Sequence, residues 1–177
     1  MVATKGFTLI ELLIVLAIGA VLTGVAVPSV TGMLRQHRLT AAHNELLTSL
    51  YLLRSEAAKR NRIVKMCRIS NPRAPQCDTS AGRGWDAGWA IWVDTDNDNR
   101  IGAGETLVSV HPAFGHGLRL TGNGSLVNRI AYLPTGAPSG FNNGTFTVCT
   151  RGRADKRQIV LSSAGRIRTQ RASGVCP

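Results

Sequence analysis

The chain has 177 residues, a formal net charge of +11, 19 glycines and only 5% aromatic residues. This length provides one hydrophobic core beside a long helix, and the lack of internal repeats excludes a repeat architecture. The glycine content favours a turn-rich β domain over a helical bundle. The positive charge points to an anionic partner, such as nucleic acid, lipid headgroups, polysaccharide or an acidic protein, and says nothing about the fold.

An apolar segment runs from Phe7 to Val27 and contains a single charged residue, Glu11. At about 1.5 Å rise per residue, a helix of this length spans the ~30 Å hydrocarbon core of a bilayer. A signal peptide is disfavoured because its apolar region is roughly 7–15 residues long and carries no acid. A buried soluble helix is disfavoured because the segment is apolar on all sides. A membrane anchor remains, in which an unpaired acid costs up to about 3 kcal/mol.

The residues around Glu11 carry a specific resemblance. The stretch KGFTLIEL, from Lys5 to Leu12, resembles the processing site of type IV prepilins and type II secretion pseudopilins. The resemblance implies that a prepilin peptidase cleaves between Gly6 and Phe7 and that Phe7 is then N-methylated. It implies residence in the inner membrane, with the domain in the periplasm, until the chain joins an extracellular pilus. It also implies that Glu11 pairs with the terminal amine of a neighbouring pilin subunit, which relieves the cost of a lone carboxylate in a low dielectric.

Residues 28–62 are expected to continue the helix in an amphipathic form. Pro28 should kink it, because proline removes a backbone donor and clashes with the preceding turn. An apolar stripe then recurs at steps of three and four residues, formed by Leu39, Leu46, Leu50, Leu53 and Ala57. His37 and His43 lie on this helix without a second metal ligand at helical spacing, and we expect both at the surface.

From residue 63 the pattern changes to short strands bounded by Gly, Pro, Asn or Ser. Eight strands are expected, at residues 63–69, 88–93, 106–110, 117–121, 129–133, 144–150, 157–163 and 165–171. A helix followed by antiparallel strands predicts an α+β fold, with a long N-terminal helix packed on an antiparallel β-sheet domain.

The extent and order of these strands are similar to the FimT/GspH branch of the type IV pilin superfamily, which implies the type IV pilin fold. The likeness is clearest in GWAIWVDTDNDN and RQIVLSSAGRIRTQ. The expected organisation is a leader at residues 1–6, a transmembrane or filament-core helix at 7–27, an amphipathic helix at 28–62 and a periplasmic or extracellular β domain at 63–177.

Four cysteines follow the apolar segment: Cys67, Cys77, Cys149 and Cys176. An even number in a domain carried across a membrane indicates two disulfides, for which three pairings exist. We favour Cys67–Cys77 and Cys149–Cys176, because each closes a segment flanked by predicted strands. Zinc is the alternative, but no short C-x2-C spacing is present. The second bridge would hold the C-terminus, a part of a chain that otherwise frays.

The segment DTDNDNRIGAGE joins two predicted strands. Asp94, Asp96, Asp98 and Glu105 fall at positions 1, 3, 5 and 12 of an EF-hand-like loop, which makes calcium a candidate cofactor. Against calcium, Asn99 replaces the glycine of the sharp turn, and the flanking segments read as strands instead of helices. The alternative is a hairpin loop of Asx turns, which Asp and Asn favour. No other cofactor is expected.

The C-terminal stretch RGRADKRQIVLSSAGRIRTQR is strongly basic and contains one acid, Asp155. Its cationic residues are Arg151, Arg153, Lys156, Arg157, Arg166, Arg168 and Arg171. Gly165 stands where a tight turn would join two strands. Alternation along the last strand puts Arg166 and Arg168 on one face and Ile167 on the other, with the two arginines about 6.8 Å apart. This spacing suits successive phosphates of a nucleic-acid backbone. The segment GRIR resembles the G-R-x-R motif of FimT-type minor pilins that bind DNA for natural transformation, which implies DNA as a partner.

A second basic run straddles the end of the predicted helix and is the second choice for a DNA path; it comprises Lys59, Arg60, Arg62, Lys65, Arg68 and Arg73. Cations at this place also favour the helix dipole. No H-E-x-x-H, G-x-S-x-G or phosphate-loop motif occurs and the histidines are scattered, so we do not expect an enzyme.

The favoured function is a FimT-type minor pilin that binds extracellular DNA. One alternative is a structural, GspH-like subunit of a type IV pilus or of a type II secretion pseudopilus, without DNA binding. A further alternative is a calcium-stabilised adhesin.

Overall fold

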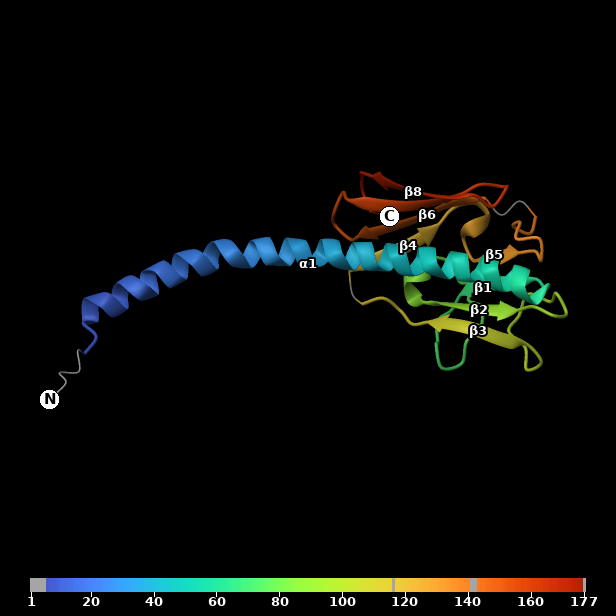
Figure 1. The fold of residues 1–177 in the computed structure, drawn as a ribbon, viewed down its shortest axis with the longest axis horizontal. Helices are drawn as coiled ribbons and strands as arrows, with labels where there is room; N and C mark the ends of the chain where they lie inside the picture. Colours follow the sequence, from blue (N-terminus) through green and yellow to red (C-terminus); the bar gives the residue numbers. More distant parts are fainter. Residues whose placement is uncertain (1–5, 116, 141–142, 177) are drawn as a thin grey trace. The chain divides into compact units, whose positions relative to one another are not determined.

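The protein is described by a computed structural model that covers residues 6–115, 117–140 and 143–176, without the side chains of residues 23 and 25–29. The chain divides into two units, residues 1–38 and residues 39–177. One helix, α1 (Leu9–Arg60), contributes to both and continues through Pro28 without ending there (Figure 1). Of the predicted leader, only Gly6 lies within the described residues.

The first unit consists of the start of α1, with its apolar side chains on the outside. The Oγ1 atom of Thr8 accepts a hydrogen bond from the backbone N–H of Glu11 at 3.3 Å, which is the contact of an N-cap residue with the third helical position. Glu11 is exposed in the first turn, where its charge favours the helix dipole.

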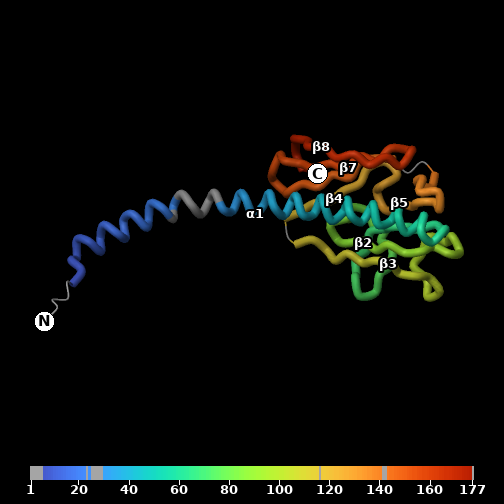
Figure 2. Tube along the Cα trace, viewed as in Figure 1, coloured from blue at the N-terminus to red at the C-terminus, as the bar shows by residue number. Residues whose placement is uncertain are grey.

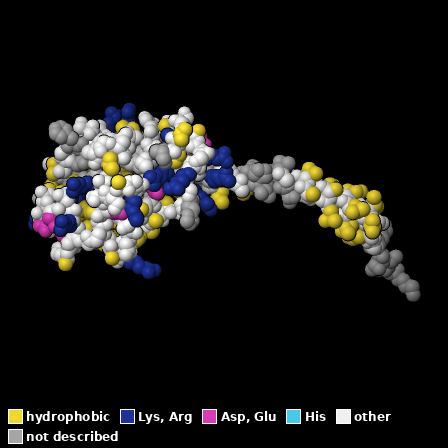
Figure 3. Space-filling view, turned by 180° about the vertical axis from the view of Figure 1, so that it is seen from behind, with side chains coloured by type: hydrophobic (Ala, Val, Ile, Leu, Met, Phe, Trp, Pro, Cys, Tyr) yellow, Lys and Arg dark blue, Asp and Glu magenta, His cyan; other side chains and the backbone are white. Residues whose placement is uncertain are grey.

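Exposed large apolar side chains follow one another along this unit and form the yellow cluster in Figure 3. They include Phe7, Leu9, Ile10, Leu12, Leu13, Ile14, Val15, Leu16, Ile18, Val21 and Leu22. Apolar surface of this extent marks a segment that contacts lipid or protein. Within the described residues, however, no helical stretch combines the length and the hydropathy needed to cross a membrane. Residue 23 and residues 25–27 of the predicted segment 7–27 lie outside the described side chains.

Within the described residues, the second unit contains the rest of α1 and eight strands in two antiparallel four-stranded sheets, shown in Figures 1 and 2. The first sheet has the order β3-β2-β1-β5, made of β1 (Val64–Arg68), β2 (Trp89–Val93), β3 (Thr106–His111) and β5 (Arg129–Tyr132). The second has the order β4-β6-β7-β8, made of β4 (Leu118–Gly122), β6 (Gly144–Thr150), β7 (Lys156–Leu161) and β8 (Ile167–Ala172). Short 3-10 turns, η1 (Trp85–Ala87) and η2 (Gly124–Leu126), precede β2 and β5. All eight predicted strands are present, and the α+β class is confirmed. The division into two sheets was not predicted.

The predicted apolar stripe of α1 forms the centre of a core shared with both sheets. Leu46, Leu50 and Leu53 are fully buried among side chains from β1, β2, β4, β5, β6 and β7. Burying one such side chain contributes about 1.5–3 kcal/mol. The indole N–H of Trp89 donates to Ser49 Oγ at 3.0 Å, which fixes β2 against the helix.

Two disulfides hold the strands in place, with the predicted pairing. Cys67 at β1 bonds to Cys77 with a Cα–Cα distance of 5.5 Å. Cys149 at the end of β6 bonds to Cys176 with a Cα–Cα distance of 5.7 Å, so the C-terminus is tied to the second sheet.

Candidate functional site

The basic C-terminal stretch forms a β-hairpin at one edge of the second sheet, where β7 pairs with β8. The turn is closed by hydrogen bonds from the N–H of Gly165 to Ser162 O at 2.9 Å and from the N–H of Ser162 to Arg166 O at 3.1 Å. Gly165 has φ +77°, and a Cβ atom there would lie 2.8 Å from Pro138 Cδ. Glycine is therefore required at this turn, as the sequence indicated.

The hairpin places two groups of cations at its opposite ends. We call Arg166 and Arg168, which follow the turn, the turn-end pair; both are exposed. The strand-end group lies at the other end, where β7 begins and β8 ends, and comprises Arg151, Arg153, Lys156, Arg157 and Arg171. Five residue steps separate the two ends, which corresponds to about 17 Å along the strands.

The two faces of the hairpin differ. Ile167, opposite buried Leu161, packs partly against the core, as predicted, and Arg168 points away from it. Arg171 lies four residues after Ile167 and therefore shares its inward face, whereas Arg168 lies on the opposite face. Arg171 is directly opposite Arg157 on β7. The predicted basic surface is therefore divided between two faces of the sheet.

A pocket of about 250 Å³ lies between α1 and the strand-end group, lined by His43, Arg157, Thr169, Gln170 and Arg171. The expectation that His43 is a surface residue is wrong: it is 5% exposed. Its Nδ1 atom and the Nε atom of Arg157 are buried without a hydrogen-bond partner. Burial, followed by the charge of Arg157, lowers the pKa of His43 below its usual value, so this imidazole favours the neutral form.

The cations of the hairpin are not paired with acids, which distinguishes them from Lys59, Arg60, Lys65, Arg83 and Arg119 in the same domain. Within the described part of the chain, no ion pair involves any member of the turn-end pair or the strand-end group. By contrast, Arg83 Nε lies 3.3 Å from Asp78 Oδ2, and Arg119 Nη1 lies 3.6 Å from Asp86 Oδ2.

The second basic run is largely committed to the structure of the domain, so the expectation of a second DNA path fails for its inner members. Arg68 is 2% exposed and donates hydrogen bonds to three backbone carbonyls, those of Asp78, Ser80 and Arg83. Lys65 is 4% exposed and pairs with Asp94. A buried and paired cation is not available to a phosphate.

The acidic loop between β2 and β3 contains the predicted Asx turns. The N–H of Asp98 donates to Asp96 Oδ1 at 3.1 Å, and the N–H of Arg100 donates to Asp98 Oδ1 at 2.7 Å. Asn97 and Asn99 adopt positive φ, +61° and +66°, so Asn99 makes the turn that glycine makes in an EF-hand loop. One side-chain oxygen from each of Asp94, Asp96, Asp98 and Glu105 lies within 4.8 Å of the others.

Comparisons with known proteins agree with this architecture. The family model "Type II transport protein GspH" matches residues 42–165, and the "Prokaryotic N-terminal methylation motif" matches residues 1–27. The chain is 32% identical over 174 residues to the pilin-like protein PilA1 of Thermus thermophilus, covering 94% of this chain and 98% of that protein.

Two solved structures share the fold. The type IV minor pilin FimU of Pseudomonas aeruginosa matches with a TM-score of 0.60 at 22% identity, over 77% of this chain and 90% of FimU. The minor pseudopilin EpsH of the Vibrio cholerae type II secretion system matches with a TM-score of 0.53 at 13% identity, over 75% of this chain and 96% of EpsH.

An N-terminal methylation motif on a helix that packs against antiparallel sheets defines a type IV pilin-like subunit. The chain belongs to the GspH family, within the minor type IV pilins and pseudopilins. Membership implies association with other pilin subunits and with the machinery of a pilus or pseudopilus. These relatives are pilins and pseudopilins, not enzymes.

Proposed function

We propose that this minor pilin binds extracellular DNA through the β7–β8 hairpin, independently of base sequence, and serves DNA uptake in natural transformation. The observation that carries the proposal is the set of unpaired cations on this hairpin. Arginine and lysine side chains without acidic partners bind phosphates by releasing the counterions of the DNA, a contribution that does not depend on sequence.

The turn-end pair is the expected primary contact. Arg166 and Arg168 are both exposed, and the backbone of Arg166 is fixed by a hydrogen bond from its N–H to Ser162 Oγ at 3.1 Å. A DNA strand that follows the outer face of the hairpin for about 17 Å meets the turn-end pair first and then Lys156, which lies opposite Ala172 on the same face as Arg168. The Cys149–Cys176 disulfide ties down the strand-end group, which lowers the ordering cost of binding.

The pocket beside the strand-end group suits a phosphate. Arg157 and Arg171 are directly opposite each other on neighbouring strands, and two like charges in this position repel. The unpaired Nε atom of Arg157 lies at the same pocket as His43. An anionic oxygen between the two arginines removes the repulsion and supplies the missing acceptor.

The direct test compares DNA binding by a fragment that starts at residue 28 with binding by its Arg166→Ala/Arg168→Ala variant. Removal of two phosphate contacts should weaken binding of a duplex at low salt at least tenfold, while circular dichroism shows unchanged folding. The matched control is Arg100→Ala/Arg129→Ala, which removes the same charge from exposed positions outside the hairpin and outside the second basic run. Equal losses in the two variants would assign binding to net charge alone, and the hairpin proposal would be wrong.

For the N-terminal segment we infer cleavage between Gly6 and Phe7, N-methylation of Phe7 and a single membrane crossing before assembly. The motif match over residues 1–27 and the exposed apolar surface of the first unit support this inference. In the filament, Glu11 is proposed to neutralise the amino terminus of a neighbouring subunit, because a carboxylate surrounded by apolar helices needs a positive partner.

A structural role without DNA binding is the second candidate function. The fold match to the pseudopilin EpsH and the GspH family model favour it. In that case the unpaired cations of the hairpin meet an acidic surface of another subunit. Failure of the intact fragment to bind DNA at low salt would favour this function.

A further inference from the structure

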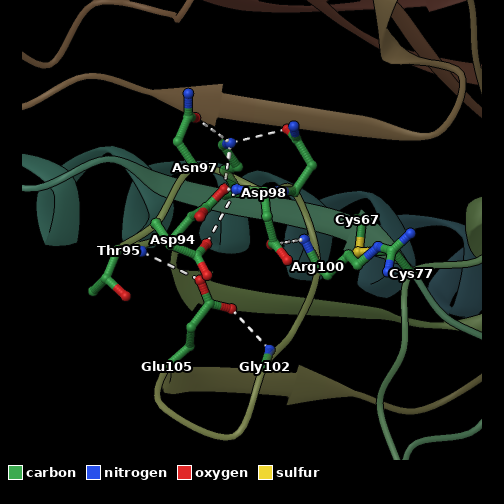
Figure 4. Close-up of polar contacts among 12 residues, drawn as sticks. Cys67, Cys77, Asp94, Thr95, Asn97, Asp98, Arg100, Gly102 and Glu105 are labelled. Atoms are coloured by element: carbon green, nitrogen blue, oxygen red, sulfur yellow. Dashed lines mark hydrogen bonds and ion pairs between the residues drawn. A yellow bond between two sulfur atoms is a disulfide. The ribbon is translucent and has the colours of Figure 1, made fainter.

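We propose that the loop between β2 and β3 binds one calcium ion through Asp94, Asp96, Asp98 and Glu105. Figure 4 labels three of them, Asp94, Asp98 and Glu105. Each residue offers one carboxylate oxygen, and the four oxygens lie within 4.8 Å of one another. Calcium binds oxygen at about 2.3–2.6 Å, so two ligands on opposite sides of one ion lie about 4.6–5.2 Å apart. The four oxygens are therefore close enough to one another to belong to the coordination shell of a single ion.

The Oδ1 atom of Asp94 points independently to a missing cation. The Asp94 side chain is fully buried, and its Oδ1 atom has no hydrogen-bond partner. A buried carboxylate oxygen without a partner raises the free energy of the folded state more than an unpaired neutral group does. Such an oxygen normally has a hydrogen-bond donor or a metal ion as its partner. A calcium ion among the four carboxylates supplies the partner.

Lys65 does not remove the need for this ion. Its ammonium group forms an ion pair with Asp94 Oδ2 and donates to Asn97 Oδ1 at 2.8 Å and to Asn99 Oδ1 at 2.9 Å. An ammonium group has three N–H donors, and these contacts use all three. Asp96, Asp98 and Glu105 therefore receive no hydrogen bond from Lys65, and one positive charge faces four negative charges.

Glu105 is held ready to complete the site. Its Oε1 atom accepts from the N–H of Thr95 at 3.2 Å and its Oε2 atom accepts from the N–H of Gly102 at 3.0 Å, so the carboxylate is oriented by the backbone. Asp94 and Glu105 present carboxylate oxygens within 4.8 Å of each other, and a divalent cation between them offsets their like charges.

The ligand set selects the type of ion. Four carboxylates without nitrogen or sulfur ligands suit a hard divalent cation. Calcium accepts six to eight oxygens in irregular geometry, whereas magnesium demands an octahedron and retains several waters. With three of the four ligand residues exposed or half-buried, the expected affinity is that of extracellular calcium modules, with a Kd of about 0.1–1 mM.

The experiment measures thermal unfolding of the full-length chain in a non-ionic detergent, with 10 mM calcium or with a chelator. Calcium should raise the Tm by several degrees, and 10 mM magnesium should raise it by less than half as much. Isothermal titration with calcium chloride should give one site per chain. No rise in Tm and no binding heat at 10 mM calcium would overturn the proposal, and equal effects of the two ions would overturn the choice of calcium.

The decisive variant is Asp96→Asn/Asp98→Asn. Asparagine retains the side-chain oxygen that accepts the Asx-turn hydrogen bond, so the loop keeps its shape and loses two charges. This variant should fold, should lose the calcium effect, and should bind DNA as the unmodified chain does. Asp155→Asn, which removes an exposed acid elsewhere, is the control and should keep the full effect. A calcium effect that survives in Asp96→Asn/Asp98→Asn would contradict this site.

Discussion

Lys65 and Asp94 form an ion pair that is almost entirely removed from solvent, with side-chain exposures of 5% and 0%. Lys65 belongs to β1 and Asp94 follows the last residue of β2, so the pair joins two neighbouring strands at the base of the acidic loop. The amide oxygens of Asn97 and Asn99 complete the surroundings of the ammonium group. This single cation therefore contacts three residues of the loop, Asp94, Asn97 and Asn99.

Lys65→Met should destabilise the domain by about 3–5 kcal/mol, because it leaves a buried carboxylate without its partner. Denaturant unfolding measures the change. Arg62→Met, at an exposed position three residues earlier, is the control and should change the free energy of unfolding by less than about 0.5 kcal/mol. A loss below about 1 kcal/mol for Lys65→Met would show that the pair does not organise the loop.

Acidification below neutral pH should destabilise the domain through His43. The pKa of His43 is lowered in the folded state, so the unfolded chain, with a His pKa of about 6.5, binds the proton more readily. The contribution of neutral His43 to the free energy of unfolding is complete above about pH 6.5 and is lost as the pH falls towards the pKa of His43 in the folded state. Thermal unfolding should show a lower Tm at pH 5.5 than at pH 7.5.

The variant His43→Gln should lose most of this dependence between pH 7.5 and 5.5, since the titrating group is gone. His37→Gln, at an exposed position of the same helix, should retain it. An unchanged dependence in His43→Gln would assign the effect to another group.

The disulfide that holds the C-terminus should contribute more to stability than the other. Cys149–Cys176 closes a separation of 27 residues and Cys67–Cys77 one of 10. The lost entropy of the unfolded chain corresponds to a contribution to the free energy of unfolding of about 3.5 kcal/mol for Cys149–Cys176 and about 2.7 kcal/mol for Cys67–Cys77. Denaturant unfolding of Cys149→Ser/Cys176→Ser and of Cys67→Ser/Cys77→Ser measures which disulfide contributes more.

Of these two variants, only Cys149→Ser/Cys176→Ser should also weaken DNA binding, because it frees the strand-end group. An equal loss of DNA binding in both variants would contradict a role of this disulfide in DNA binding.

Processing and assembly can be tested at two residues of the first unit. Mass spectrometry of the mature protein should find N-methylated Phe7 as the first residue. Glu11→Ala should leave cleavage intact and remove the protein from sheared fibres, because the terminal amine of the neighbour loses its partner. Arg35→Ala, an exposed change on the same helix, should not affect incorporation. Normal incorporation of Glu11→Ala would exclude the assembly role.

Local patterns in the sequence predicted much of the fold. Leucine spacing identified the buried face of α1, alternation identified the strands, and the turn at Gly165 is present. The prediction that His43 lies at the surface is wrong, because the absence of a second metal ligand at helical spacing does not determine whether a side chain is buried. His43 stands four residues after Leu39 and three before Leu46, within the apolar stripe, and this spacing predicts burial.

Other features depend on contacts between distant segments, which the sequence alone does not show. The pairing of Lys65 with Asp94 follows from the register of β1 with β2, and the position of Arg171 opposite Arg157 follows from the register of β7 with β8. The commitment of Arg68 to three carbonyls of the loop after Cys77 is likewise a tertiary property. The number of basic residues in the second basic run therefore overestimates how many of its cations are available to bind phosphate.

The salt dependence of DNA affinity tests the central claim most directly. With about four phosphates contacted, log K should fall against log salt concentration with a slope of about −3 to −4 for the fragment from residue 28, and the slope should become shallower by about 2 in Arg166→Ala/Arg168→Ala. A slope near zero, or an identical slope in the variant, would contradict binding of DNA by this hairpin.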